Sequence, residues 1–146
     1  MRLYLSYDPA DRDQAQAFGR KLTQADSQVI LVERPEALPG ETPPTDEIKA
    51  AIEASLAQAS VAVCVVSEAT KDNVWVNFEM AAAEMEGRGI VGFFIEDLYL
   101  GPLEWPEFFR LRHTQYEVMS QGPTPKILKA IQRAERKGTQ TNLFGM

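Results

Sequence analysis

Glu79 is the residue of this sequence best suited to chemistry. Residues 72–87 have the pattern of one short helix, in which a spacing of four places Trp75 beside Glu79 one turn earlier. Because a charged carboxylate is costly to desolvate, we expect Glu79 to face a cleft, where it is a candidate catalytic or binding group. The simpler alternative is that Glu79 is a surface acid and Trp75 a core anchor. Two apolar stripes leave few positions of this helix for water, namely Val74, Phe78, Ala81, Ala82 and Met85 on one side and Val76, Met80 and Ala83 on the other.

Several other kinds of site are disfavoured. The turn at residues 7–10 contains neither G-x-G-x-x-G nor a Walker lysine motif, which argues against a dehydrogenase or an ATPase. The single His113 and the single Cys64 cannot supply a metal cluster or a Cys-His couple of the usual kind, so no metal is expected. Cys64 lies inside an apolar run and is interpreted as structural. A response-regulator receiver is disfavoured because the third predicted strand ends in Ser67 instead of a phospho-acceptor aspartate.

Strands and helices alternate along the chain. Apolar and β-branched runs predict strands near residues 2–7, 28–33, 61–66 and 90–95, the second of them buried on both faces, with a weak fifth strand at 116–119. Asp8, Thr45, Asp72 or Asn73, and Thr124 have the positions of helix caps. Residues 96–113 show no sustained period, and a short helix over the sheet edge is expected there. The last helix is predicted to end at Gly138, which gives a single domain over 1–138 and a flexible tail over 139–146.

This alternation predicts a flavodoxin-like α/β fold, a three-layer sandwich around a parallel sheet of about five strands in the order 2-1-3-4-5. Such sheets bind ligands beyond the carboxyl ends of the strands, at the point where the strand order reverses. Here that point lies between strands one and three, at residues 6–8 and 67–73. The second of these turns leads into the helix that carries Glu79, so fold and candidate residue predict the same cleft.

The composition indicates in which compartment the protein is expected and which partners are disfavoured. The 146 residues, 45% of them hydrophobic and 25% charged, are typical of one globular domain. No apolar run approaches the roughly 20 residues that span a bilayer, and the N-terminus has no signal-peptide pattern, so we expect a cytoplasmic protein without membrane contact. A net charge of −6 disfavours binding to nucleic acid, which depends on clustered lysine and arginine.

Four short segments carry a family resemblance. They are Leu5-Ser6-Tyr7-Asp8 at the end of the first strand, the proline-rich segment after the second, Val65-Val66-Ser67, and Trp75-x-x-x-Glu79. In this order and spacing they resemble a TIR domain over roughly residues 1–95. The short chain and the form Trp75-Val76-Asn77-Phe78-Glu79 are similar, more narrowly, to the TIR-like proteins of bacterial Thoeris anti-phage systems.

The resemblance implies that Glu79 matches the catalytic glutamate of TIR enzymes, which cleave the bond between nicotinamide and ribose in NAD. NAD is then a substrate, and no cofactor is expected. The resemblance also makes other residues near the strand ends candidates for substrate binding. They are Ser6, Tyr7, Asp8, Arg34, Ser67 and Trp75, with Lys71 and Arg112 as further cations for the pyrophosphate. Two departures stand out: Asn73 replaces the serine that many TIR sequences carry two residues before the tryptophan, and residues 96–113 fit no TIR segment.

Three hypotheses follow. The first is an NAD-consuming signalling enzyme of anti-phage defence, which makes an ADP-ribose-derived messenger, cyclic or not, for a separate effector protein. The second is a non-enzymatic TIR-type interaction module, with homotypic contacts through residues 35–44 and 108–109. The third is an enzyme similar to nucleoside deoxyribosyltransferases, which also use a glutamate against a sugar. We also expect self-association into a homo-oligomer, through the proline-rich segment or through residues 96–113.

Overall fold

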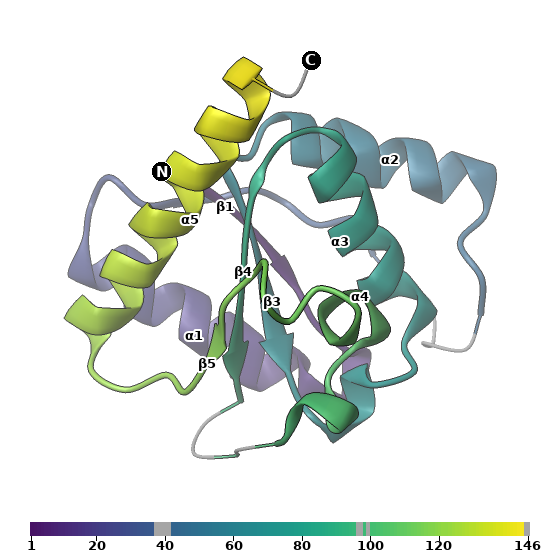
Figure 1. The fold of residues 1–146 in the computed structure, drawn as a ribbon, viewed down its shortest axis with the longest axis horizontal. Coiled ribbons are helices and arrows are strands. Elements are labelled where there is room, and N and C mark those ends of the chain that lie inside the picture. Colours follow the sequence, from purple (N-terminus) through teal and green to yellow (C-terminus); the bar gives the residue numbers. More distant parts are fainter. Residues whose placement is uncertain (37–41, 96–97, 99, 145–146) are drawn as a thin grey trace.

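The sheet is parallel and has the predicted order. The computed structural model describes residues 1–36, 42–95, 98 and 100–144, the last six of them as backbone only. Its strands are β1 (Arg2–Ser6), β2 (Ile30–Leu31), β3 (Val61–Val66), β4 (Gly89–Phe94) and β5 (Val118–Met119). They pair in the order β2-β1-β3-β4-β5, and every pairing is parallel (Figure 1). The flavodoxin-like architecture expected from the alternation is therefore confirmed.

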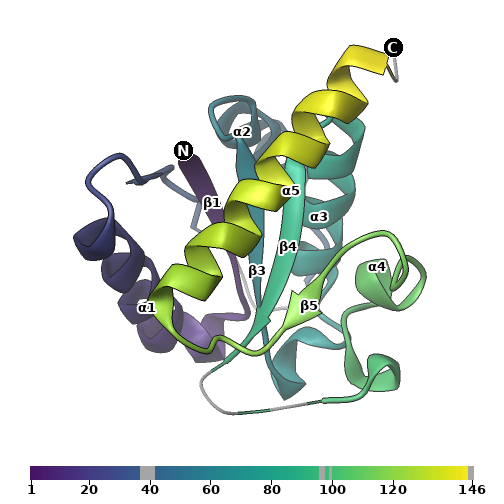
Figure 2. The same cartoon turned by 60° about the vertical axis from the view of Figure 1, so that its left-hand side comes forward.

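Helices cover both faces of this sheet. α1 (Arg12–Ala25) and α5 (Thr124–Phe144) pack on one face, while α2 (Asp46–Ala57), α3 (Val74–Met85) and the short α4 (Glu107–Arg110) lie on the other (Figures 1 and 2). The described residues also contain three short 3-10 turns, namely η1 (Pro9–Asp11), η2 (Glu68–Thr70) and η3 (Pro102–Glu104). Because strand side chains alternate between faces, Leu3 and Leu5 of β1 pack beneath α1 and α5, whereas Tyr4 belongs to the core beneath α2 and α3.

Three of the four predicted helix caps are present. The exception is Thr124, which is the first residue of α5, and the amides of Lys126 and Ile127 donate to the Pro123 carbonyl oxygen before it. The Asp8 side chain accepts a hydrogen bond from the Ala10 amide, and Thr45 accepts one from Ile48. Of the two candidates before α3, the cap is Asn73, whose Oδ1 accepts hydrogen bonds from the amides of Trp75 at 2.8 Å and Val76 at 3.0 Å. One detail differs from the prediction, because Pro9 opens the 3-10 turn η1 and α1 itself begins at Arg12.

The two edges of the sheet differ most from the predicted strands. β2 has two residues instead of six, and Ile30 is 48% exposed, so the prediction of a strand buried on both faces is wrong. The reason is its place at the sheet edge, where β2 pairs with β1 alone. At the other edge, β5 is also two residues long. The short helix expected within residues 96–113 is present as α4, which buries Phe108 and Phe109 beside α3, although residues 96, 97 and 99 lie outside the described residues.

The sequence pattern predicted that the last helix ends at Gly138. This prediction is wrong, because α5 continues to Phe144. The glycine serves a close approach between α5 and the start of β4. A Cβ atom at Gly138 would lie 2.3 Å from the backbone nitrogen of Gly89, and one at Gly89 would lie 2.3 Å from the Ala134 carbonyl oxygen. Any side chain at either position would therefore push the helix away from the strand.

This contact predicts that Gly138→Ala destabilises the fold by about 1–3 kcal/mol, the usual cost of overpacking, although alanine is the better helix former. Urea unfolding gives the free energy directly. Gly101→Ala is the matched control, because a Cβ atom there has no neighbour within 4 Å, and it should leave stability unchanged. A more stable Gly138→Ala protein would show that helix propensity outweighs the close approach.

Cys64 lies in β3, is fully buried and is not disulfide-bonded. Burial raises the pKa of its thiol, which keeps the sulfur protonated and agrees with a structural role. Of the helices in the described residues, none combines the length and the hydrophobicity needed to cross a membrane.

Candidate active site

Glu79 lies at the predicted switch point, but it does not face a cleft. Its side chain is only 1% exposed. The carboxylate tolerates this burial because protein donors take the place of water. The expectation of a cleft-facing acid is therefore wrong, since helix periodicity carries no information about donors on other elements.

Among the described residues, three side chains hold the Glu79 carboxylate. Ser6 Oγ donates to Oε1 at 2.8 Å, and Tyr4 Oη donates to Oε2. Arg34 binds both oxygens at once, with Nη2 2.6 Å from Oε1 and Nε 2.7 Å from Oε2. Tyr4 and Ser6 come from alternate positions of β1, whereas Arg34 comes from the segment after β2. Each carboxylate oxygen thus accepts two hydrogen bonds.

Charge fixes the protonation of these partners. Burial raises the pKa of Tyr4, and the adjacent negative charge of Glu79 raises it further, so the phenol keeps its proton and remains a donor. Burial is the largest single effect on Arg34 and opposes its charge, but attraction to Glu79, the hydrogen bonds to it and the nearby Tyr4 and Tyr7 together leave the pKa of Arg34 above its usual range. The Arg34 side chain is 8% exposed, so it forms a nearly dry ion pair with Glu79.

The orientation of α3 explains why Glu79 points inward. The helix buries the side that carries Trp75, Val76, Glu79, Met80 and Ala83. The predicted stripe through Val74 and Met85 lies partly on the outside, and Met85 is 89% exposed. The expectation that both apolar stripes are buried is therefore wrong, because the donors above Glu79 allow the acid to occupy the inner side.

Arg34 also borders a cavity of about 650 Å³. The cavity lies between the turn after β1, the segment after β2 and helix α2, and its lining includes Tyr7, Arg12, Glu33, Glu36 and Ser55. Tyr7 holds Arg34 from this side: its carbonyl oxygen accepts a hydrogen bond from Nη1 at 2.9 Å, and its ring centroid is 4.4 Å from Cζ. Arg34 thus contacts the buried acid and also lines the open cavity.

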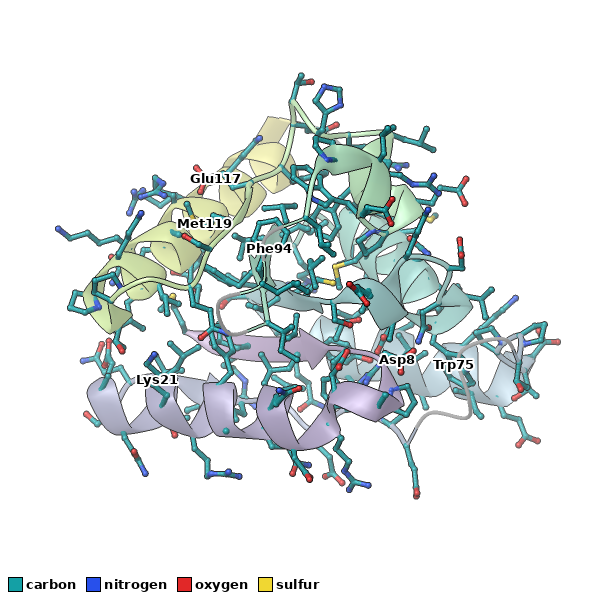
Figure 3. The ribbon with its side chains drawn as sticks, turned by 90° about the horizontal axis from the view of Figure 1, so that it is seen from below. Asp8, Lys21, Trp75, Phe94, Glu117 and Met119 are labelled. Atoms are coloured by element: carbon teal, nitrogen blue, oxygen red, sulfur yellow. The ribbon has the colours of Figure 1, made fainter. Side chains whose placement is uncertain are left out.

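Asp8 and Ser67 belong to a neighbouring network that joins the ends of β1 and β3. Asn73 Nδ2 donates to Asp8 at 2.8 Å, and Ser67 Oγ donates to Asp11. Burial raises the pKa of Asp11, the Ser67 hydrogen bond opposes this, and the nearby Asp8 charge adds to it. Figure 3 shows Asp8 at the turn that leads from β1 into the first helix. These contacts tie the two predicted loops together beside the Glu79 cluster.

Trp75 packs in the core and does not line the cavity. Its indole Nε1 is buried without a hydrogen-bond partner among the described residues. Of the two other cations considered, Lys71 pairs with Glu104 at 3.5 Å and Arg112 with Glu84 at 3.1 Å. The structure therefore gathers Ser6, Tyr7 and Arg34 around Glu79 and places the rest outside the cluster.

Sequence reasoning missed Tyr4. A signal was present, because Tyr4 and Ser6 are two residues apart in a strand and therefore share one face. Asp11 and Arg12 were also missed, since helix-terminal charges are usually solvated. As for metals, the described residues contain no group of three or more His, Cys, Asp or Glu side chains placed to hold an ion.

Fold and site together define a doubly wound α/β domain with a buried, arginine-paired glutamate where the strand order reverses. The sequence profile of the TIR domain family matches residues 3–133, and the chain belongs to this family. The match continues well past residue 95, where the resemblance of the motifs ended. No curated protein sequence matches the chain significantly.

Proposed function

We propose that this TIR domain cleaves the bond between nicotinamide and ribose in NAD, with Glu79 as the catalytic carboxylate. The TIR family includes NAD-cleaving enzymes. The observation that supports the proposal most is the Glu79 cluster itself, in which Tyr4 and Ser6 of β1 hold a carboxylate. Sheets of this kind bind ligands beyond the carboxyl ends of their strands. A cavity of about 650 Å³ adjoins the cluster at Arg34 and falls within the usual size of a ligand pocket.

The chemistry suits a single carboxylate. When the glycosidic bond breaks, its electron pair leaves with nicotinamide and positive charge develops on the ribose. A fixed anion in a dry site stabilises this oxocarbenium-like state. Ser6 and Tyr4 orient the carboxylate, Arg34 meets the diphosphate, and the ring of Tyr7 offers a surface for a base to stack on. Asp8, Ser67 and Trp75 support the site from the adjoining turn and helix.

The wider role follows from the same proposal. Hydrolysis or cyclisation of the ribosyl group yields an ADP-ribose-derived messenger, which a separate effector protein would bind, as in Thoeris-like anti-phage defence. We further propose self-association through residues 35–44 or 96–113, parts of which lie outside the described residues. Light scattering of the purified protein checks this last point, and a strict monomer with full activity would remove it.

One observation favours a second candidate, the non-enzymatic interaction module. Both Glu79 oxygens are already occupied by donors from the protein, which is what a purely structural ion pair would show. On this alternative Glu79 serves only stability, and NAD is left intact.

Offering NAD and deoxynucleosides separately to the purified protein distinguishes the candidates. We expect nicotinamide release from NAD, with products resolved by chromatography and mass spectrometry, in the presence or absence of infected-cell lysate as a trigger. Base exchange on deoxynucleosides would instead identify a deoxyribosyltransferase. If the protein self-associates but cleaves nothing under any condition, the interaction module is the better account.

A further inference from the structure

We propose that Arg34 and Glu79 exchange their ion pair for the two charged ends of one zwitterionic ligand, a dinucleotide with a cationic base and a diphosphate. The inference rests on the proposed function and deepens it, because it says how the buried acid becomes available to substrate. Arg34 would release Glu79 and take the diphosphate. Glu79 would then meet the cationic nicotinamide riboside end.

Geometry supports the exchange. Arg34 is the side chain that both lines the cavity and covers the two Glu79 oxygens, at 2.6 and 2.7 Å. It comes from the segment after β2, whereas Glu79 belongs to α3, so the two groups can separate without breaking a helix or a strand. A guanidinium fork binds a phosphate in the same bidentate manner as a carboxylate.

Charge balance makes the exchange selective. Glu79 keeps its hydrogen bonds from Tyr4 and Ser6 when Arg34 leaves, but it loses the one cation that pairs with it among the described residues. A ligand with negative charge alone would leave the buried carboxylate without a counter-charge, which is unfavourable. NAD carries a positive nicotinamide ring one ribose away from its diphosphate. The ring replaces the positive charge beside Glu79, and the diphosphate replaces the negative charge beside Arg34.

The cavity lining adds to this selectivity. Glu33 and Glu36 border the cavity together with Arg12 and Arg34. With Arg34 paired to Glu79, the remaining charged groups of the lining carry more negative than positive charge. Such a lining repels a simple anion. It accepts a diphosphate only when Arg34 turns toward it.

Ligand affinities measured by calorimetry test the exchange. The probes are carba-NAD, a non-cleavable cationic analogue in which a methylene replaces the ribose ring oxygen, together with NADH and ADP, which lack the cationic ring. The wild type should bind carba-NAD about tenfold or more tightly than NADH or ADP, a difference within the usual range of coupling between contacting charges.

Substitution of Glu79 should abolish this preference. In Glu79→Gln, Arg34 is free at the outset, so ADP and NADH should bind about tenfold more tightly than to the wild type. In Arg34→Gln, ADP should bind weakly, and adding Glu79→Gln should not tighten it. Arg12→Gln is the matched control, because Arg12 lines the same cavity and is not among the Glu79 donors; it should lower affinity yet keep the response to Glu79→Gln.

Equal affinities of the wild type for carba-NAD and NADH would overturn the exchange, as would failure to bind any of the three probes. This comparison needs no variant and so does not depend on variant folding. Nicotinamide release by the wild type is measured in parallel. Nicotinamide release without tighter binding of carba-NAD would rule out the exchange and keep the proposed function. Tighter binding of carba-NAD without nicotinamide release would keep the exchange and rule out the proposed function.

Discussion

Glu79→Gln is expected to lower the rate of nicotinamide release from NAD by about a hundredfold or more, which is the usual effect of removing one preorganised electrostatic group. Glutamine has nearly the same volume and helix propensity, but it carries no charge with which to stabilise a positive ribosyl group. The rate is measured as nicotinamide formed per protein at saturating NAD. Affinity for carba-NAD should survive well enough for binding to be detected.

The structure adds a cost in stability to this substitution. Both carboxylate oxygens of Glu79 accept hydrogen bonds, whereas the amide nitrogen of glutamine would point donor hydrogens at Arg34 and at either Ser6 or Tyr4. Lost hydrogen bonds to a charged group predict a loss of about 1.5–3 kcal/mol, so folding must be confirmed by circular dichroism. Glu84→Gln, on the same helix and paired with Arg112, is the matched control and should keep full activity. Unchanged turnover in a folded Glu79→Gln protein would discard the catalytic assignment.

The second large effect concerns stability. Arg34→Met should lower the free energy of unfolding by about 3 kcal/mol, because it leaves the buried Glu79 charge without its cation. This is the lower end of the range for breaking a buried pair, since water can enter from the adjoining cavity. Urea unfolding monitored by circular dichroism gives the value.

A double substitution separates the lost pair from other effects. Arg34→Met combined with Glu79→Met removes both charges and should recover most of the lost stability, as replacement of a buried ion pair by apolar groups usually does. Arg133→Met is the control, because the Arg133–Glu117 pair is about half exposed and such pairs contribute less than about 1 kcal/mol. Equal costs for Arg34→Met and Arg133→Met would mean that the Glu79 pair contributes no more than a surface contact.

Most of the fold could be predicted because local signals agree with one another. Runs such as Val61–Val66 are continuous and apolar, as strands covered on both faces must be, and Thr45 and Asn73 cap the helices that the periodicity indicates. The errors lie where tertiary contacts decide. Ile30 is exposed because its strand lies at the edge of the sheet. Gly138 stands inside α5 and not at its end, because the helix passes too close to the backbone of Gly89 to leave room for a side chain.

The site was predictable in part. The position of Glu79 at the strand ends followed from the alternation of elements and the switch point of the sheet. Its environment did not, because the partner Arg34 is 45 residues away in sequence and reaches Glu79 only through the pairing of β1 with β2. The pattern of a single helix indicates that burying an acid is unfavourable. Burial becomes favourable only through hydrogen-bond donors on other elements, which this pattern does not show. Tyr4 could have been found, because it shares one face of β1 with the predicted Ser6.

A crystal structure with carba-NAD bound would show whether Glu79 is the group that acts on the ribose of NAD. We expect the Glu79 carboxylate to lie within hydrogen-bond reach, ~3 Å, of the nicotinamide ribose. Arg34 should then bind the diphosphate in the cavity beside Tyr7. A ligand bound elsewhere, with the Arg34–Glu79 pair intact, would contradict the assignment of Glu79 as the group that acts on NAD.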